Sequence, residues 1–488
     1  MGKTRFLMLL PAAVAILAAT CGCQGEKPRS PVNVAIRDGD PEPADWGKAY
    51  PVEYELWKKT AEPKKAGSSR YKRGWDTDLI IYDKLSEFPY MGVLFNGWGF
   101  GIEYNEPRGH HYMISDQLDV DHSRLKAGGV CLTCKTPYAS ALKKEMGADY
   151  FSKPFMEVHA KIPKDHAKLG VMCNDCHDPK TMENRIDRWT LKEALEETGK
   201  DPATLTHQEL RSAVCAQCHV TYVIPKDGAM KSVGLFFPWD GGKFGKTSVE
   251  TIIKKIRSSD SYREWTQKVT GLKLGFIRHP EFELFSNGSV HWNASVACAD
   301  CHMPYKRVGH YKVSDHDVTS PLKNDLRGCV QCHSEGVEWL KSQVYAIQDR
   351  TMSGMLRAGY QAAFAAKLIE KINETGGPGG PEDSSIYKRM IGNYEEAFYR
   401  VVFIGAENSI GFHNPSEAGR ILADALAFGG EAERLAAVLL TRRGVNMDEV
   451  NTNATAYLNS RGDKHLEFRP AQELKDPSGL APQFPGGR

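Results

Sequence analysis

The chain has 488 residues, and its 63 Lys+Arg against 61 Asp+Glu give a formal net charge of +2 at pH 7. This balance excludes the strongly basic surface of a nucleic-acid-binding protein and the long acidic tail of a disordered one. Hydrophobic residues make up 41% and charged residues 25%, as in ordinary folded proteins. The 12 cysteines are the feature of the composition that needs an explanation.

The first 23 residues have the pattern of a secretory signal. Two basic residues within the first five precede an apolar, uncharged run from Phe6 to Ala19. This run is shorter than the about 20 residues of a membrane-spanning helix. Cys21 and Cys23 fall at the expected cleavage point, so both removal with the peptide and attachment of a lipid stay open. We expect a periplasmic protein, with a lipid anchor as the alternative.

Three further regions follow the signal. Gln24 to Asp45 is rich in Pro, Glu and Asp, which is typical of a linker. Residues 46–335 contain all the remaining cysteines, so we expect them to form the catalytic core. Residues 336–488 contain helical patterns and no cysteine, so we expect a helical region packed on that core.

The remaining ten cysteines form five pairs with the spacing C-x-x-C. The pairs are Cys131/Cys134, Cys173/Cys176, Cys215/Cys218, Cys298/Cys301 and Cys329/Cys332. In four of them a histidine follows the second cysteine directly: His177, His219, His302 and His333. C-x-x-C-H is the attachment motif of a c-type haem, in which both thiols bond the haem and the histidine reaches its iron. Zinc sites or disulfides would not explain four histidines at one offset.

The first pair differs, because Cys131-Leu132-Thr133-Cys134 is followed by Lys135. Lys135 can be a surface residue of a decayed motif, or the iron ligand of this haem can lie elsewhere. In the third interpretation, Lys135 itself binds the iron as a neutral amine, a form that burial beside a cation favours. A different ligand at one haem of five would mark that haem as chemically distinct.

Helical periodicity dominates the C-terminal region. Apolar residues recur at helical spacing from about Glu338 to Glu374, and a glycine-rich stretch ends this pattern. A second helix is predicted from about Ser385 to Ala406. Asn414, Pro415 and Glu417 have the pattern of an N-cap, a first-turn proline and a third-position glutamate of another helix.

Four C-x-x-C-H motifs with one C-x-x-C-K resemble the pentahaem cytochrome c nitrite reductases that form ammonium. The resemblance extends to Tyr104–His110 (YNEPRGH), Tyr222, Arg278–Glu281 (RHPE), Asp315-His316 and His413–Pro415 (HNP). It implies a mainly α fold with a loop-rich haem core and long C-terminal helices. It also implies five covalently attached haems, six-electron reduction of nitrite, and a homodimer. The helices of residues 336–488 could form the dimer interface or simply cover the haem core, and only the resemblance favours the interface.

The resemblance also implies roles for individual residues. Four distal histidines would complete four bis-histidine haems that only transfer electrons: His110, His291, His316 and His413. The iron beside Lys135 would keep one face open for nitrite. Arg108 and His279 would bind and protonate the nitrite oxygens, and Tyr222 would hold a late intermediate or relay a proton.

One position departs from the family pattern. Family members commonly hold a calcium through a glutamate before the pocket tyrosine and a glutamine before the pocket histidine. Here these positions are Thr221 and Arg278. Calcium prefers several oxygen ligands, so the loss of a carboxylate and the gain of a guanidinium disfavour it. We expect that calcium is absent and that Arg278 supplies the positive charge.

Two other functions stay open. A pentahaem electron carrier without a substrate would have five six-coordinate irons and an incidental Lys135. A related reductase of hydroxylamine or sulfite would use the same open iron. The resemblance implies a membrane-associated quinol-oxidising electron donor, and nothing in the chain identifies that donor.

Overall fold

The computed structural model describes residues 34–72, 83–125, 127–451, 453, 455–459 and 468–480. The expected signal sequence, with Cys21 and Cys23, and residues 24–33 of the expected linker lie outside the described residues. None of the described helices is long and apolar enough to cross a membrane.

Part of the segment expected to be a linker contacts the rest of the protein. Ile36 and Trp46 are buried in an apolar cluster with Met172. The indole of Trp46 donates to the backbone carbonyl of Asp40 at 3.0 Å. Helix α1 spans Pro43–Ala49. The proline suggested a linker, but proline is also well suited to a first helical turn, where its missing N–H has no partner to lose.

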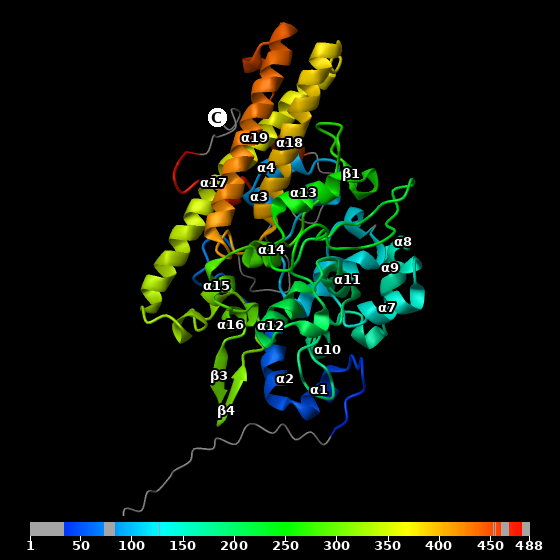
Figure 1. The fold of residues 1–488 in the computed structure, drawn as a ribbon, viewed down its shortest axis with the longest axis vertical. Coiled ribbons are helices and arrows are strands. Elements are labelled where there is room, and N and C mark those ends of the chain that lie inside the picture. The colour runs from blue at the N-terminus through cyan, green and yellow to red at the C-terminus, as the bar shows by residue number, and fades with distance from the viewer. Residues whose placement is uncertain are drawn as a thin grey trace, which may run out of the picture.

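Short helices and long connections form the region before residue 337 (Figure 1). After α1, its α-helices are α2 (Pro51–Lys58), α3 (Lys84–Glu87), α4 (Tyr90–Leu94), α5 (Gly99–Ile102), α6 (Met113–Leu118), α7 (Ala139–Met146), α8 (Asp149–Ser152), α9 (Phe155–His159), α10 (Cys173–Cys176), α11 (Trp189–Glu197), α12 (His207–Ala216), α13 (Val249–Arg257), α14 (Glu281–Ser286), α15 (Val290–Asn293) and α16 (Cys298–His302). Two antiparallel hairpins complete it: β1 (Trp265–Thr266) with β2 (Lys273–Leu274), and β3 (Tyr305–Val308) with β4 (Tyr311–Ser314).

Each cysteine motif lies on or at the end of a helical turn. The second motif is α10, the third begins near the end of α12, and the fourth is α16. The first and fifth lie at 3₁₀ turns, Gly128–Leu132 and Cys329–Gln331. Residues three apart share one face of a helical turn, so both thiols of a motif can point to the same side. This is the local geometry that two bonds to one edge of a flat ring require.

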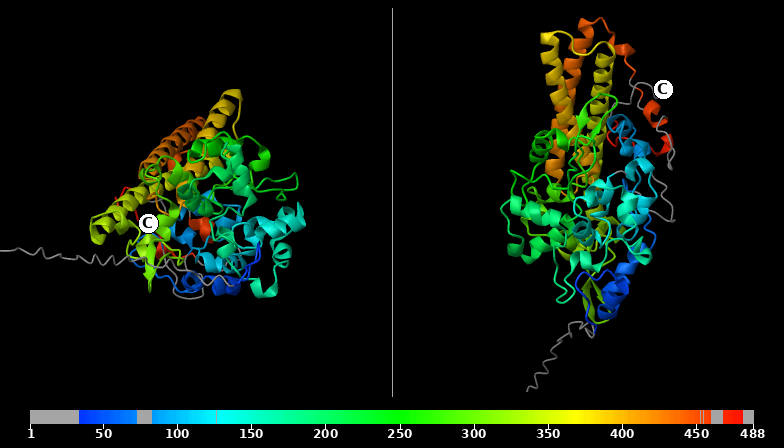
Figure 2. Two further views of the ribbon diagram at one scale, coloured as in Figure 1. Left: turned by 60° about the horizontal axis from the view of Figure 1, so that its bottom comes forward. Right: turned by 90° about the vertical axis from the view of Figure 1, so that its right-hand side faces the viewer.

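Three long helices form a bundle above this region (Figures 1 and 2). They are α17 (Val337–Glu374), α18 (Pro381–Ala406) and α19 (Pro415–Arg442). The structure confirms the predicted first helix. It also confirms Asn414 as an N-cap, since its side chain accepts from the Glu417 N–H at 3.3 Å. The second helix begins four residues earlier than predicted, because Pro381 occupies its first turn. A short helix, α20 (Thr455–Asn459), follows.

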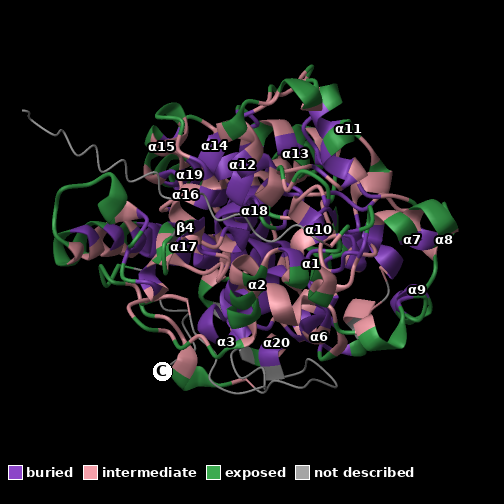
Figure 3. Ribbon diagram, turned by 90° about the horizontal axis from the view of Figure 1, so that it is seen from below, coloured by how far each residue is buried: buried purple, intermediate pink, exposed green. Residues whose placement is uncertain are grey.

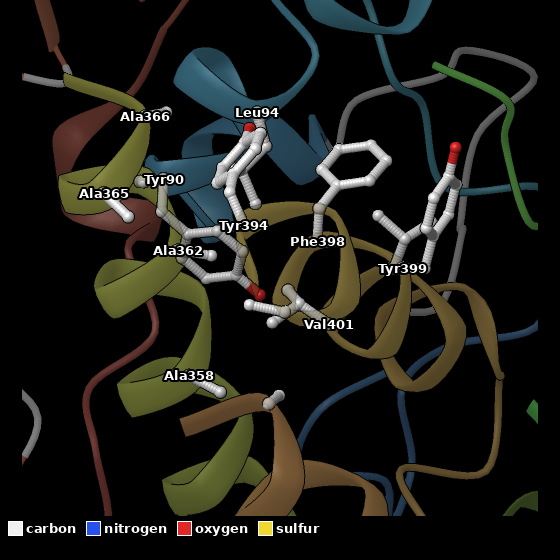
Figure 4. Packing of buried hydrophobic residues seen from close by; sticks show 14 of the residues in the cluster. Tyr90, Leu94, Ala358, Ala362, Ala365, Ala366, Tyr394, Phe398, Tyr399 and Val401 are labelled. Carbon is white, nitrogen blue, oxygen red and sulfur yellow. The ribbon is translucent and has the colours of Figure 1, made fainter. Parts of the chain in front are cut away.

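The main apolar core lies where the bundle meets the short helices. Tyr90 of α4 packs among Ala358 and Ala362 of α17 and Tyr394 of α18 (Figure 4). A Cβ atom on Gly359 would come within 2.4 Å of the Tyr90 ring, so the close approach of α4 requires glycine there. Seen from below, buried residues of α12, α14 and α18 fill the centre of the molecule (Figure 3). The expected mainly α fold is confirmed.

Candidate active site

The histidines form four pairs that match the expected ligand sets. Two imidazoles on opposite faces of one metal ion have ring centres about 6 Å apart, from two metal–nitrogen bonds of about 2 Å plus the ring radii. The observed separations are 6.4, 6.1, 6.4 and 6.3 Å. Each pair joins a motif histidine to one of the four histidines expected on the distal side: His219 with His110, His177 with His316, His333 with His291, and His302 with His413.

Backbone carbonyls orient three of these imidazoles. Nδ1 of His177 lies 3.0 Å from the carbonyl of Met182, and Nδ1 of His302 lies 3.0 Å from that of Thr319. Nδ1 of His316 lies 2.9 Å from the carbonyl of Ser314. A proton held on Nδ1 leaves the lone pair on Nε2, where it can bind a metal ion.

Burial also keeps these rings in the form that binds metals. It lowers the pKa of His110, His177 and His302 to about 4, with neighbouring histidines adding to the effect. The three imidazoles are therefore neutral near pH 7, and a neutral imidazole is the form with a lone pair to donate.

The cysteines lie next to one another between motifs. All ten in the described chain are free thiols. Cys134 acts electrostatically on Cys218, and Cys298 acts on Cys215, so the third motif lies close to both the first and the fourth. No group of three or more His, Cys, Asp or Glu side chains among the described residues could hold a metal ion. Thiol pairs on one turn with two facing imidazoles thus fit a haem and do not fit a zinc site.

Cys332 is the exception among the ten cysteines predicted to hold haem. It is exposed, whereas the other nine are half-buried. The 3₁₀ turn Cys329–Gln331 ends just before it, and Cys332 therefore begins the loop that leads to α17. Cys329 packs against the buried Leu326, and the side chain of His333 is 48% exposed. The fifth motif is thus partly covered at Cys329 and exposed at Cys332.

Lys135 lies in a different environment from the motif histidines. Its amine is close enough to Asp116 to lower the pKa of that carboxyl, although burial outweighs this effect and the net pKa of Asp116 is raised. It also acts electrostatically on Cys131 and Cys134 of its own motif. The Lys135 motif therefore lies beside the ion pair between Asp116 and Arg108.

Arg108 is held by two carboxylates. Its Nε donates to Oδ1 of Asp116 at 2.6 Å, and its Nη2 donates to Oδ2 of Asp119 at 3.1 Å. The backbone N–H of Arg108 donates to the other oxygen of Asp116 at 2.7 Å. Its guanidinium also lies over the ring of Tyr112, with 4.5 Å between the guanidinium carbon and the ring centre. Arg108 is thus fixed next to the Lys135 motif, and the same contacts form a structural ion pair.

Tyr222 and Arg278 are in contact beside the same motif. The guanidinium of Arg278 lies 4.9 Å from the centre of the Tyr222 ring, and its Nη1 donates to the Tyr222 carbonyl at 3.3 Å. Burial raises the pKa of Tyr222 and outweighs the Arg278 guanidinium, which acts to lower it. The phenol therefore keeps its proton at neutral pH and can donate a hydrogen bond.

Arg278 itself forms a buried ion pair with Glu264. Its Nη1 donates to Oε1 at 2.9 Å, and its Nη2 contacts Oε2. Its backbone N–H donates to the hydroxyl of Thr221 at 3.2 Å. Thr221 and Arg278, the two residues expected to disfavour calcium, are therefore hydrogen-bonded to each other. Glu264 supplies the carboxylate that pairs with Arg278.

His279 has a left-handed backbone, with φ at 48°, and its side chain is 47% exposed. Its Nδ1 lies 3.9 Å from Oε1 of Glu281, and Oε2 of the same carboxylate lies 4.0 Å from Nδ1 of His219. Burial works to raise the pKa of Glu281, but both histidines outweigh it and hold that pKa at about 2. Glu281 therefore links the candidate pocket histidine to a candidate haem ligand.

Sequence reasoning gave no role to the carboxylates that support these residues: Asp116, Glu264, Glu281 and Glu407. Glu407 lies with Oε1 2.6 Å from Nδ1 of His413. The surrounding sequence gave little signal, since Glu264, for example, lies in the largely polar segment Asp260–Lys268. Buried carboxylates are rare unless they are paired, but the sequence does not identify their partners.

Comparisons with known proteins agree with this fold and these motifs. The cytochrome c552 family model matches residues 42–483, and the chain belongs to this family of multihaem c-type cytochromes. The chain is similar to the cytochrome c nitrite reductase subunit NrfA of Nitratidesulfovibrio vulgaris strain Hildenborough, with 36% identity over 74% of this chain and 70% of that protein. It is also similar to cytochrome c-552 of Bacteroides thetaiotaomicron, with 31% identity over 83% of this chain and 80% of the relative.

A solved structure shows the same architecture. The cytochrome c nitrite reductase from Desulfovibrio desulfuricans ATCC 27774 superposes with a TM-score of 0.75 and 27% identity, covering 84% of this chain and 89% of that one. That structure has two calcium sites in its catalytic subunit, NrfA. The chain is therefore an oxidoreductase of this family, as the motifs predicted.

Proposed function

We propose that this protein reduces nitrite to ammonium at a haem attached to Cys131 and Cys134, with Lys135 as the proximal ligand. Four bis-histidine haems at the other motifs would supply the electrons. The observation that carries the proposal is the set of four histidine pairs, each with the separation expected across an iron, at the motifs that end in histidine. The haem at the motif that ends in Lys135 would then be the one that binds the substrate.

The reaction consumes one nitrite, six electrons and eight protons, and it yields one ammonium and two waters. The haems would supply electron storage and an open iron, and the protein must supply charge, orientation and protons. Arg108 would attract the nitrite anion and donate to its oxygens. Tyr222 would donate through its protonated phenol, and His279 would pass protons to the departing oxygen.

We further propose that Arg278 takes the place of a calcium ion. Its buried pair with Glu264 and its bond to the Tyr222 carbonyl tie together the chain segments around Thr221 and Arg278. A calcium ion there would face a guanidinium and lose the Glu264 carboxylate to it. Exhaustive chelation should therefore leave turnover unchanged, and a strict requirement for added calcium would contradict the proposal.

The function is tested on the purified, haem-loaded protein. We expect a mass with five covalent haems, a ferric spectrum that changes on addition of nitrite, and ammonium formed at one per nitrite consumed. Five haems with no spectral change would instead indicate the electron carrier. Faster turnover of hydroxylamine or sulfite than of nitrite would indicate the related reductases.

We also propose that the protein works in the periplasm. The signal pattern of the first 23 residues supports export to the periplasm, and Cys21 or Cys23 would carry a lipid anchor if one is attached. Electrons would come from a membrane-associated quinol-oxidising partner, and the protein would act as a homodimer. N-terminal sequencing and mass analysis of the mature protein test the cleavage and the lipid.

A further inference from the structure

Glu407 is a fully buried carboxylate that follows the last residue of α18. Its side chain has 0% exposure, and Oε1 lies 2.6 Å from Nδ1 of His413. The contact is close but not linear, so it is the contact of an ion pair more than of a well-aligned hydrogen bond. His413 is the histidine that faces His302 of the fourth cysteine motif. Glu407 therefore lies directly behind a candidate haem ligand.

Every hydrogen-bonding partner of the Glu407 carboxylate is a donor. Oε1 also accepts the backbone N–H of Ser409 at 2.8 Å, and Oε2 accepts the Ser409 hydroxyl at 2.9 Å and the Gly411 N–H at 3.2 Å. A carboxyl group that only accepts is the ionised form. The Ser409 carbonyl accepts from Nε2 of Gln348 on α17 at 3.0 Å, so the loop that carries these donors is anchored to the bundle.

The other candidate ligands have weaker partners. His177, His302 and His316 face neutral backbone carbonyls at about the same distance. His333 lies 3.9 Å from Glu335, whose side chain is 45% exposed and therefore screened by water. The buried Glu281 lies farther away, 4.0 Å from His219. Among these contacts, Glu407 gives the closest buried negative charge.

We propose that Glu407 is a positioning residue that lowers the reduction potential of the haem attached to Cys298 and Cys301. A carboxylate behind a ligating imidazole makes the ring a stronger donor to the metal. A buried negative charge also stabilises the ferric ion over the ferrous ion, which carries one positive charge less. Both effects make this haem harder to reduce. The inference rests on the proposed ligation by His302 and His413.

The location of this haem gives the shift a consequence. Cys298 of the fourth motif acts electrostatically on Cys215 of the third, and Cys329 of the fifth motif acts electrostatically on Cys301 of the fourth. The fourth haem would therefore connect the third and fifth. A low potential at the fourth haem would keep electrons on the haems of the third and fifth motifs instead of on the fourth haem between them.

The test is a spectroelectrochemical titration of the haem-loaded Glu407→Gln variant. Glutamine keeps the shape and removes the charge. We expect one of the five midpoint potentials to rise by at least about 59 mV, with haem content unchanged. For a one-electron couple, this rise is a tenfold change in the equilibrium constant for reduction. Glu335→Gln removes an exposed carboxylate from a ligand histidine and is the matched control, with no such rise.

The outcomes separate this inference from the proposed ligation. If His413 is a ligand, the His413→Ala variant should lose the low-spin bis-histidine spectrum of one haem. An unchanged spectrum in that variant would refute the ligation. With the ligation intact, a Glu407→Gln midpoint no higher than in Glu335→Gln overturns the role of Glu407. If Glu407→Gln does not mature, Glu407→Asp withdraws the charge by about one C–C bond, and the same midpoint should rise by a smaller amount. No rise in that variant also overturns the proposal.

Discussion

The ion pair between Arg278 and Glu264 allows a quantitative test of the support beside the pocket. The two side chains are 6% and 2% exposed, and two guanidinium nitrogens contact the two carboxylate oxygens. Arg278→Gln removes the cation and leaves a carboxylate in a site of low dielectric constant. Breaking a buried pair from one side costs about 3–5 kcal/mol. We therefore expect the free energy of unfolding to fall by that amount.

The assay is urea unfolding of the haem-loaded protein, followed by far-ultraviolet circular dichroism. Arg278→Gln should lower the midpoint without changing the denaturant slope. The double variant with Glu264→Gln should recover much of the loss, because the two residues are directly coupled. Lys48→Gln breaks an exposed pair with Asp45 and should cause no measurable change. A loss no larger than in Lys48→Gln, or a double variant equal to the sum of the singles, would refute the reasoning.

Three further predictions concern the pocket and its surroundings. Arg108→Ala should raise the KM for nitrite roughly tenfold or more with all haems attached. Asp119→Asn removes the charge of the 55% exposed partner of Arg108 and should leave the KM unchanged. If the two variants have the same KM, Arg108 has only a structural role. Lys135→His should change the ferric spectrum of one haem and slow turnover, and an identical spectrum would exclude Lys135 as a ligand. Burial raises the pKa of Glu283 from 4.5 to about 8, so the folded protein holds a proton that the unfolded chain releases, and stability should fall as pH rises from about 4.5 to 8. Glu283→Gln should remove that decline, and a decline that persists in the variant would point to another group.

Local patterns in the sequence were sufficient for several features. The C-x-x-C-H spacing places two thiols and an imidazole within one helical turn, so four haem motifs follow from adjacent residues alone. The helix now seen as α17 follows from apolar periodicity, and the start of α19 follows from Asn414 and Pro415. In each case, the residues that determine the feature are within a few positions of one another.

Tertiary structure decided which distant residues meet. His110 faces His219, but His413 faces His302, and nothing in the spacing orders these pairs. The sequence showed that Arg278 replaces a calcium-binding residue type, yet only the fold brings Glu264 to it. Glu407 gave no signal at all until its oxygen was found 2.6 Å from Nδ1 of His413. The physical reason is that burial, charge pairing and ligand geometry depend on contacts between separate segments, and these contacts exist only after the chain has folded.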